Sequence, residues 1–149
     1  MLGELNQEQI DYVLRSQVIG RLGCYADGKV YIVPITYVYE APYIYGHTKE
    51  GLKIKMMREN PQVCFEVDVI QNMANWQSVI VQGEYEELSG EESQQAIILL
   101  KNRVTPLLAS ESTMAAPGLD IHRSVSATRL VLVTYRIRIN HKSGRYEKR

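Results

Sequence analysis

A hydroxyl, a glycine and a lysine stand close together at Thr48, Gly51 and Lys53, where the pattern of a strand changes to that of a helix. The first turn of a helix leaves backbone N–H groups unpaired and carries a partial positive charge, so it binds phosphate readily. The stretch is therefore typical of a phosphate site. It also suits a plain strand-to-helix connection with Lys53 and Lys55 on a solvated face, which is the commoner arrangement.

Other reaction classes lack their motifs. The chain holds no G-x-S-x-G nucleophile motif, no P-loop and no G-x-G-x-x-G dinucleotide motif. Its histidines, His47, His122 and His141, do not have the spacing of metal ligands. Cys24 and Cys64 form neither a disulfide framework nor a metal knuckle. Hydrolase, nucleotidase and zinc chemistry are thus unsupported, and no metal site is predicted.

Length and charge limit the class of protein. The 149 residues suffice for one domain with its own core, and we expect that domain at 1–140 and a polar, frayed tail at 141–149. Lys plus Arg and Asp plus Glu both number 17, so no basic field favours nucleic acid. Because no apolar run reaches a membrane span and the start lacks a signal sequence, we expect a cytoplasmic protein without a membrane partner.

The elements that position these residues follow from local signals. We expect helices at 7–16, 52–59 and from 89 to about 104, and strands at 19–26, 29–39, 43–47, 62–69, 76–88 and 128–139. Asn6 and Gln9 form a capping box, and Asp27-Gly28 is a two-residue hairpin turn. Gly83 indicates a bulge, and 105–127 is expected to be a loop.

This order predicts a mainly β protein, a six-stranded antiparallel barrel with a few short helices. The strand at 29–39 is apolar on both alternations: Val30, Ile32, Pro34, Thr36 and Val38 on one face, and Tyr31, Val33, Ile35, Tyr37 and Tyr39 on the other. A small barrel buries only one of these sets inside. The other set requires a cover, which predicts a homodimer.

From Ile19 to Leu88 the chain resembles the FMN-binding split-barrel family related to pyridoxamine 5′-phosphate oxidases, and within it the nitroimidazole-resistance (Nim-type) flavoproteins. The matching segments are Ile19-Gly-Arg-Leu-Gly23, Val30-Tyr-Ile-Val-Pro-Ile-Thr-Tyr37, Ile44-Tyr-Gly-His-Thr48 with Gly51-Leu-Lys53, Asn60-Pro-Gln-Val-Cys-Phe-Glu-Val-Asp68, Trp76-Gln-Ser-Val-Ile-Val-Gln-Gly83 and Tyr135-Arg-Ile-Arg-Ile139. The resemblance implies a six-stranded split barrel that dimerises and binds FMN at the subunit interface.

The resemblance also implies roles for individual residues. Lys53, with Thr48 and the Gly51 backbone, would hold the FMN phosphate. The segment Val33-Pro34-Ile35-Thr36 would run beside the isoalloxazine ring and hydrogen-bond its polar edge. Trp76 and Ser78 would contact the flavin, from the neighbouring subunit in one arrangement, and His47 would lie near it as a catalytic residue. In the alternative reading, Trp76 only covers a strand end and His47 is a structural histidine.

The function that follows is an FMN-dependent, nitroreductase-like oxidoreductase. Its reduced flavin would pass electrons to a small organic acceptor, such as a nitroaromatic or nitroimidazole, with NAD(P)H as the expected donor. Synthesis of pyridoxal phosphate is not expected, because Ile139-Asn-His-Lys follows Arg136-Ile-Arg138 in place of the Arg/His substrate motif. The alternatives are a non-catalytic module that stores or senses flavin or haem, and a deazaflavin-binding protein.

Overall fold

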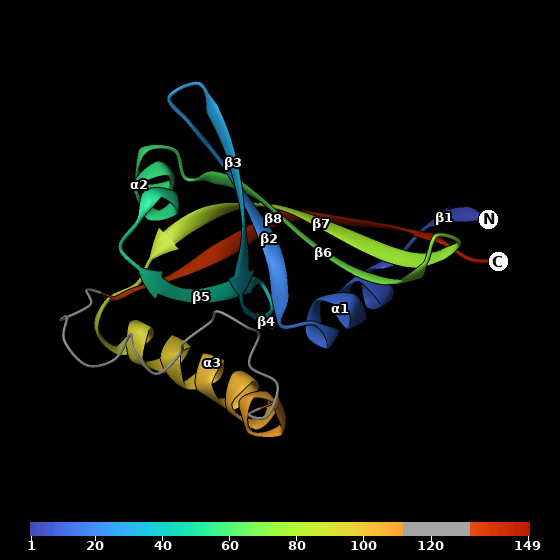
Figure 1. Cartoon of the computed structure of the whole chain (residues 1–149). Coiled ribbons are helices and arrows are strands. Elements are labelled where there is room, and N and C mark those ends of the chain that lie inside the picture. The colour runs from blue at the N-terminus through green and yellow to red at the C-terminus, as the bar shows by residue number, and fades with distance from the viewer. Residues whose placement is uncertain (112–131) are drawn as a thin grey trace.

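The computed structural model describes residues 1–111 and 132–149, and that part of the chain forms one antiparallel sheet and three helices (Figure 1). The strands are β1 (Leu2–Glu4), β2 (Ile19–Ala26), β3 (Lys29–Thr36), β4 (Val38–Glu40), β5 (Tyr43–Lys49), β6 (Gln62–Asn72), β7 (Asn75–Glu87) and β8 (Leu132–Glu147). The helices are α1 (Gln7–Ser16), α2 (Leu52–Glu59) and α3 (Gly90–Glu111). The predicted mainly β, antiparallel fold is confirmed. No helix in the described ranges is long and apolar enough to cross a membrane.

The sheet is curled, and its two end strands follow one another in the sequence. Its hydrogen-bonded order is β3-β2-β6-β7-β8-β5-β4, with β1 added beside β8. β3 and β4 lie at opposite ends of this order, although only Tyr37 separates them in sequence. The single strand predicted at 29–39 is therefore two strands, and each pairs with a different neighbour. The chain at Tyr37 therefore joins the two ends of the sheet, but no ladder of hydrogen bonds between β3 and β4 closes it in the described ranges.

Tyr37 holds this corner in place. Its backbone N–H donates to the Val18 carbonyl at 2.9 Å, and its hydroxyl donates to the Leu14 carbonyl at 2.7 Å. The ring is fully buried and meets Phe65 edge-on, with 4.8 Å between the ring centroids. Because the ring packs while the hydroxyl finds a partner, the chain turns here without leaving a buried polar group unpaired.

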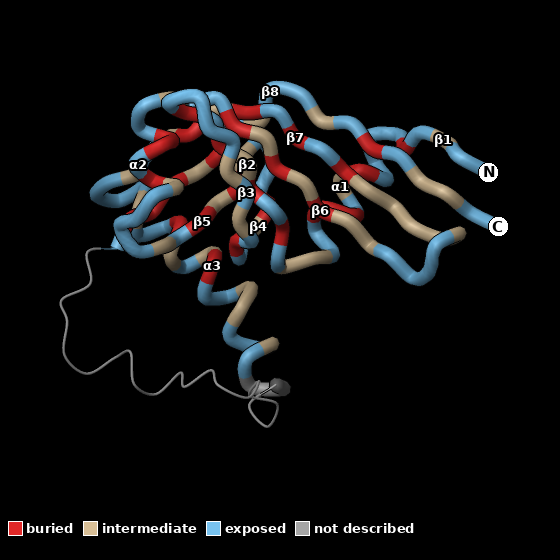
Figure 2. The backbone as a smooth tube through the Cα atoms, turned by 45° about the horizontal axis from the view of Figure 1, so that its top comes forward, coloured by how far each residue is buried: buried red, intermediate tan, exposed pale blue. Residues whose placement is uncertain are grey.

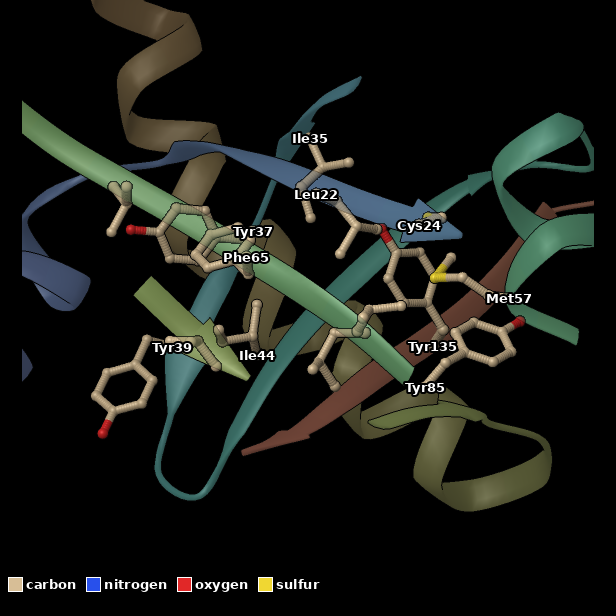
Figure 3. Packing of buried hydrophobic residues seen from close by; sticks show 14 of the residues in the cluster. Leu22, Cys24, Ile35, Tyr37, Tyr39, Ile44, Met57, Phe65, Tyr85 and Tyr135 are labelled. Carbon is tan, nitrogen blue, oxygen red and sulfur yellow. The ribbon is translucent and has the colours of Figure 1, made fainter. Parts of the chain in front are cut away.

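The core lies inside the curl of the sheet (Figures 2 and 3). It takes alternate residues of each strand, such as Leu22 and Cys24 of β2 and Phe65 of β6. In β3 the inward set includes Ile35, which is 6% exposed. The outward set includes Val30 and Ile32, which are 72% and 66% exposed. The structure thus decides which alternation of this strand needs an external cover.

The predicted capping box, hairpin turn and bulge are confirmed. In the capping box at the start of α1, the Gln9 N–H donates to the Asn6 side chain at 2.9 Å, and the Asn6 N–H donates to the Gln9 side chain at 2.8 Å. The β2–β3 turn has positive φ at both Asp27 (56°) and Gly28 (75°), as a tight hairpin requires. The β7–β8 register shifts at Gln82/Gly83, where a bulge was predicted.

Two predictions at the C-terminal side were wrong. α3 runs through Pro106 to Glu111 and does not end near 104. An internal proline removes one helix hydrogen bond, which weakens a helix at that point but does not have to end it. The rest of the predicted loop, 112–127, and the strand start at 128–131 lie outside the described residues. Residues 141–147 are not a frayed tail but the second half of β8, which pairs with β7 and β1. Backbone pairing with β7 along the whole segment, and with β1 at residues 145–147, holds this polar stretch.

Candidate functional site

The start of α2 offers unpaired hydrogen-bond donors. Gly51 is the N-cap residue, its backbone is extended, and no side chain caps the helix. The N–H groups of the first turn therefore lack the partner that Ser, Thr, Asp or Asn would provide. Gly51 is exposed, and a Cβ built on it would come no nearer than 3.8 Å to another heavy atom, the Lys49 carbonyl oxygen. The space in front of the helix is thus open to an anion.

Lys53 is a half-buried ammonium group in the first turn of this helix. Burial lowers its pKa, and the nearby Cys24 of β2 offsets only part of that effect. No carboxylate of the described residues forms an ion pair with Lys53 or raises its pKa. Other cations do have such partners: Lys142 contacts Asp11, and Arg138 contacts Glu84. A half-buried cation without a counter-ion, beside free N–H groups, suits a phosphate. The residues present therefore fit the phosphate group of a flavin nucleotide.

The side chains of Thr48 and His47 lie on opposite faces of β5. Ile44 and Gly46 of this strand are buried on the inner face, which by alternation is also the face of Thr48. His47 lies on the other face, beside α3, where burial and the charge of Lys101 lower its pKa. His47 and Thr48 are adjacent in sequence, but only Thr48 is on the side of the strand that leads to Lys53.

The segment 33–36 forms the second half of β3, an end strand of the hydrogen-bonded order. One edge pairs with β2, in the register Val33↔Leu22 to Thr36↔Ile19. The other edge has no strand partner in the part of the chain that the structure describes. Its backbone groups are therefore available to a ligand, as a flavin's polar edge requires. Pro34 and Thr36 face outward, and Val33 and Ile35 face inward.

Trp76 and Ser78 lie far from α2 within one chain. Both are among the first residues of β7. They lie in an arm formed by β6, β7, β8 and β1, which extends to the right in Figure 1. By contrast, β5 ends beside α2, on the left. The Ser78 hydroxyl donates to Glu66 Oε2 at 2.9 Å, and the Trp76 ring is half-buried. The structure does not bring these two residues to Lys53.

The outer face of β2, β3 and β6 carries a cavity of about 580 Å³ that the sequence analysis missed. Its apolar wall includes Tyr25, Val30 and Ile32, and its polar wall includes Arg21 and Glu66. Burial raises the pKa of Glu66, and the adjacent Asp68 raises it further. The apolar residues on both alternations of β3 indicated an apolar outer face. The sequence did not show that β2 and β6 complete the cavity there.

Comparison with known proteins identifies the family of the chain. Residues 6–145 match the pyridoxamine 5′-phosphate oxidase family. The chain belongs to this family. The resemblance inferred from the sequence motifs is therefore confirmed, and with it the split-barrel fold. The open sheet whose end strands are joined by the chain at Tyr37 is this protein's form of that pyridoxamine 5′-phosphate oxidase fold.

The chain is similar to two proteins of known structure and to one further protein. The crystal structure of a FAD-binding protein from Mesorhizobium loti is 30% identical, has a TM-score of 0.76, and is covered over 98% of its length by 100% of this chain. A 5-nitroimidazole antibiotic resistance protein proposed in Bacteroides thetaiotaomicron shares the fold, at 17% identity and a TM-score of 0.71, with 98% of this chain and 87% of that one covered. An uncharacterized protein of Rhizobium meliloti is 36% identical over 84 residues, which span 56% of either chain.

Proposed function

We propose that this protein binds a flavin nucleotide, FMN, whose phosphate lies at the start of α2. The observation that carries the proposal is Lys53, a half-buried ammonium group without a carboxylate partner among the described residues, beside an uncapped helix start. Thr48 would add a hydroxyl from the same face of β5. The free edge of β3 would hydrogen-bond the polar edge of the isoalloxazine ring.

The proposed site is completed by a second copy of the chain. A monomer exposes Val30, Ile32 and Tyr25 side by side around the outer cavity, and soluble monomers rarely leave such an apolar patch uncovered. In the single chain, Trp76 and Ser78 lie on the arm, away from α2. A two-fold partner would cover the patch and also place its own Trp76 and Ser78 beside the flavin.

FAD is the second candidate cofactor. The Mesorhizobium loti relative, which matches this chain over its whole length at 30% identity, is a FAD-binding protein. FMN and FAD share the ring and the first phosphate, so the residues proposed above serve either flavin.

Oxidised flavin absorbs visible light, so the purified protein, or the protein after incubation with FMN, should be yellow. Mass spectrometry of the molecule released on denaturation would distinguish FMN from FAD, haem and a deazaflavin. A colourless protein that takes up neither FMN nor FAD would contradict the proposal.

The proposed reaction is electron transfer from the reduced flavin to a small organic acceptor, a nitroaromatic or nitroimidazole compound. The flavin supplies the redox chemistry, and the protein binds and orients it. NAD(P)H is the proposed donor. Steady-state consumption of NAD(P)H in the presence of a nitroimidazole tests this reaction, and its absence in a flavin-loaded protein would favour a storage or sensing role.

His47→Ala should change turnover while leaving flavin retention within about twofold of the unaltered protein. His47 lies on the α3 side of β5, away from Lys53, and its lowered pKa favours the neutral imidazole, which can accept a proton. Loss of such a group is expected to lower kcat by about tenfold or more. Lost FMN binding with unchanged kinetics after reconstitution would instead make His47 a binding residue.

A further inference from the structure

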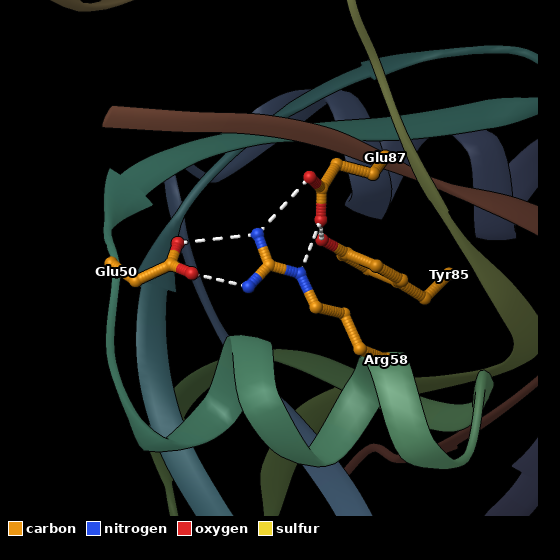
Figure 4. A network of polar contacts seen from close by, with 4 residues as sticks. All are labelled: Glu50, Arg58, Tyr85 and Glu87. Carbon is orange, nitrogen blue, oxygen red and sulfur yellow. Dashed lines mark hydrogen bonds and ion pairs between the residues drawn. The ribbon is translucent and has the colours of Figure 1, made fainter. Parts of the chain in front are cut away.

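The guanidinium of Arg58 joins the loop before α2 to the end of β7 (Figure 4). On one side it contacts both carboxylate oxygens of Glu50, with Nη2 at 3.2 Å from Oε2. On the other side Nε donates to Glu87 Oε1 at 2.8 Å, and Nη2 donates to Glu87 Oε2 at 3.1 Å. Two paired contacts of this kind fix the direction of the guanidinium plane as well as its position.

The network is anchored in the core. The Tyr85 hydroxyl donates to Glu87 Oε1 at 2.6 Å, and the Tyr85 ring is 8% exposed and packs against Tyr135. Arg58 and Tyr85 both donate to Glu87 and lower its pKa, so this carboxylate stays charged. A buried tyrosine thus sets where Glu87 lies, and Glu87 sets where Arg58 lies.

Glu50 stands in the middle of the proposed phosphate-binding segment, between Thr48 and Gly51. Packing does little to hold this loop, because Gly51 is exposed and its surroundings are open. A mobile carboxylate at Glu50 would also repel the phosphate. Bound to Arg58, the same carboxylate has its position set, and the guanidinium between it and Glu87 reduces its repulsion of the phosphate.

We propose that Arg58 is a positioning residue for the flavin phosphate. Held by Glu87, it fixes Glu50, and through Glu50 it fixes the backbone that connects Thr48 to Lys53. It acts without touching the flavin. This inference rests on the proposed flavin function and adds to it a residue that acts from the far side of the loop.

The test compares FMN with riboflavin, which carries the same ring without the phosphate. Arg58→Ala should weaken FMN binding by about tenfold and leave riboflavin binding unchanged, as judged by flavin fluorescence titration. In the Arg58→Ala background, Glu50→Gln should restore much of the lost FMN affinity, because it removes the unpaired carboxylate. Arg58→Lys, which keeps the charge but not the paired geometry, should lie between alanine and arginine.

Arg138→Ala is the matched control, since Arg138 is similarly exposed and bridges Glu84 and Glu86 away from the α2 loop. It should leave the ratio of FMN to riboflavin affinity unchanged. The inference is overturned if Arg58→Ala leaves that ratio at its original value, or if it lowers both affinities together, which is a purely structural effect. Should the alanine variant not fold, Arg58→Gln is judged by the same ratio.

The unaltered protein is titrated first. Its failure to bind either flavin would contradict the proposed function, and equal affinity for FMN and riboflavin would contradict the phosphate assignment at Lys53. Both results differ from a failure of the Arg58 inference. In that case the unaltered protein binds FMN more tightly than riboflavin, and Arg58→Ala does so by the same ratio.

Discussion

Lys53→Ala should lower the affinity for FMN by roughly ten- to more than a hundredfold while the protein remains folded. A charge-assisted hydrogen bond to a phosphate contributes about 1.5–3 kcal/mol, which corresponds to that range of affinity. The fold should tolerate the change because Lys53 makes no ion pair with a described residue, and burial already opposes its charge. Isothermal titration with FMN measures the affinity, and thermal unfolding without flavin measures the fold.

Lys55→Ala is the control for this variant, because Lys55 is in the same helix but exposed. It should bind FMN as the unaltered protein does. The affinity of the unaltered protein should also fall as the pH rises through the pKa of Lys53, which burial places below the usual lysine value, since only the ammonium form attracts phosphate. Equal FMN affinity in both alanine variants would remove Lys53 from the site.

Ile32→Glu should dissociate the proposed dimer and release the flavin with it. Ile32 is 66% exposed in the monomer and lines the outer cavity, so burying it against a partner would contribute on the order of 1.5–3 kcal/mol. An unpaired carboxylate in that place would cost several kcal/mol, roughly the range for burying a polar group without a partner. The two-fold axis would introduce the substitution twice. Sedimentation velocity and flavin fluorescence on the same sample test both consequences.

Ile98→Glu on α3 is the matched control, since Ile98 is also exposed but does not line the outer cavity. A stable monomer of Ile32→Glu that still holds FMN would show that one subunit contains the whole site. A dimer that survives the substitution would place the interface elsewhere. Ile35→Glu does not test the interface, because Ile35 is in the core and a charge there would unfold the barrel.

The amino-acid sequence by itself determined those features that depend on neighbours a few residues away. The capping box of Asn6 and Gln9 and the turn at Asp27-Gly28 are examples, because their hydrogen bonds and backbone angles lie within four residues. The candidate phosphate segment belongs to the same class. Thr48, Gly51 and Lys53 follow one another through a strand end and a helix start, so their adjacency needs no knowledge of the rest of the fold.

The tertiary structure alone decided which residues share a face or meet across the chain. The segment 29–39 is apolar on both alternations, and only the curl of the sheet places Ile35 inward and Ile32 outward. The polar residues 141–147 become strand because β1 and β7 pair with them. Arg58 meets Glu87 across 29 residues of sequence. Such contacts depend on which distant segments pair, and no local propensity encodes that choice.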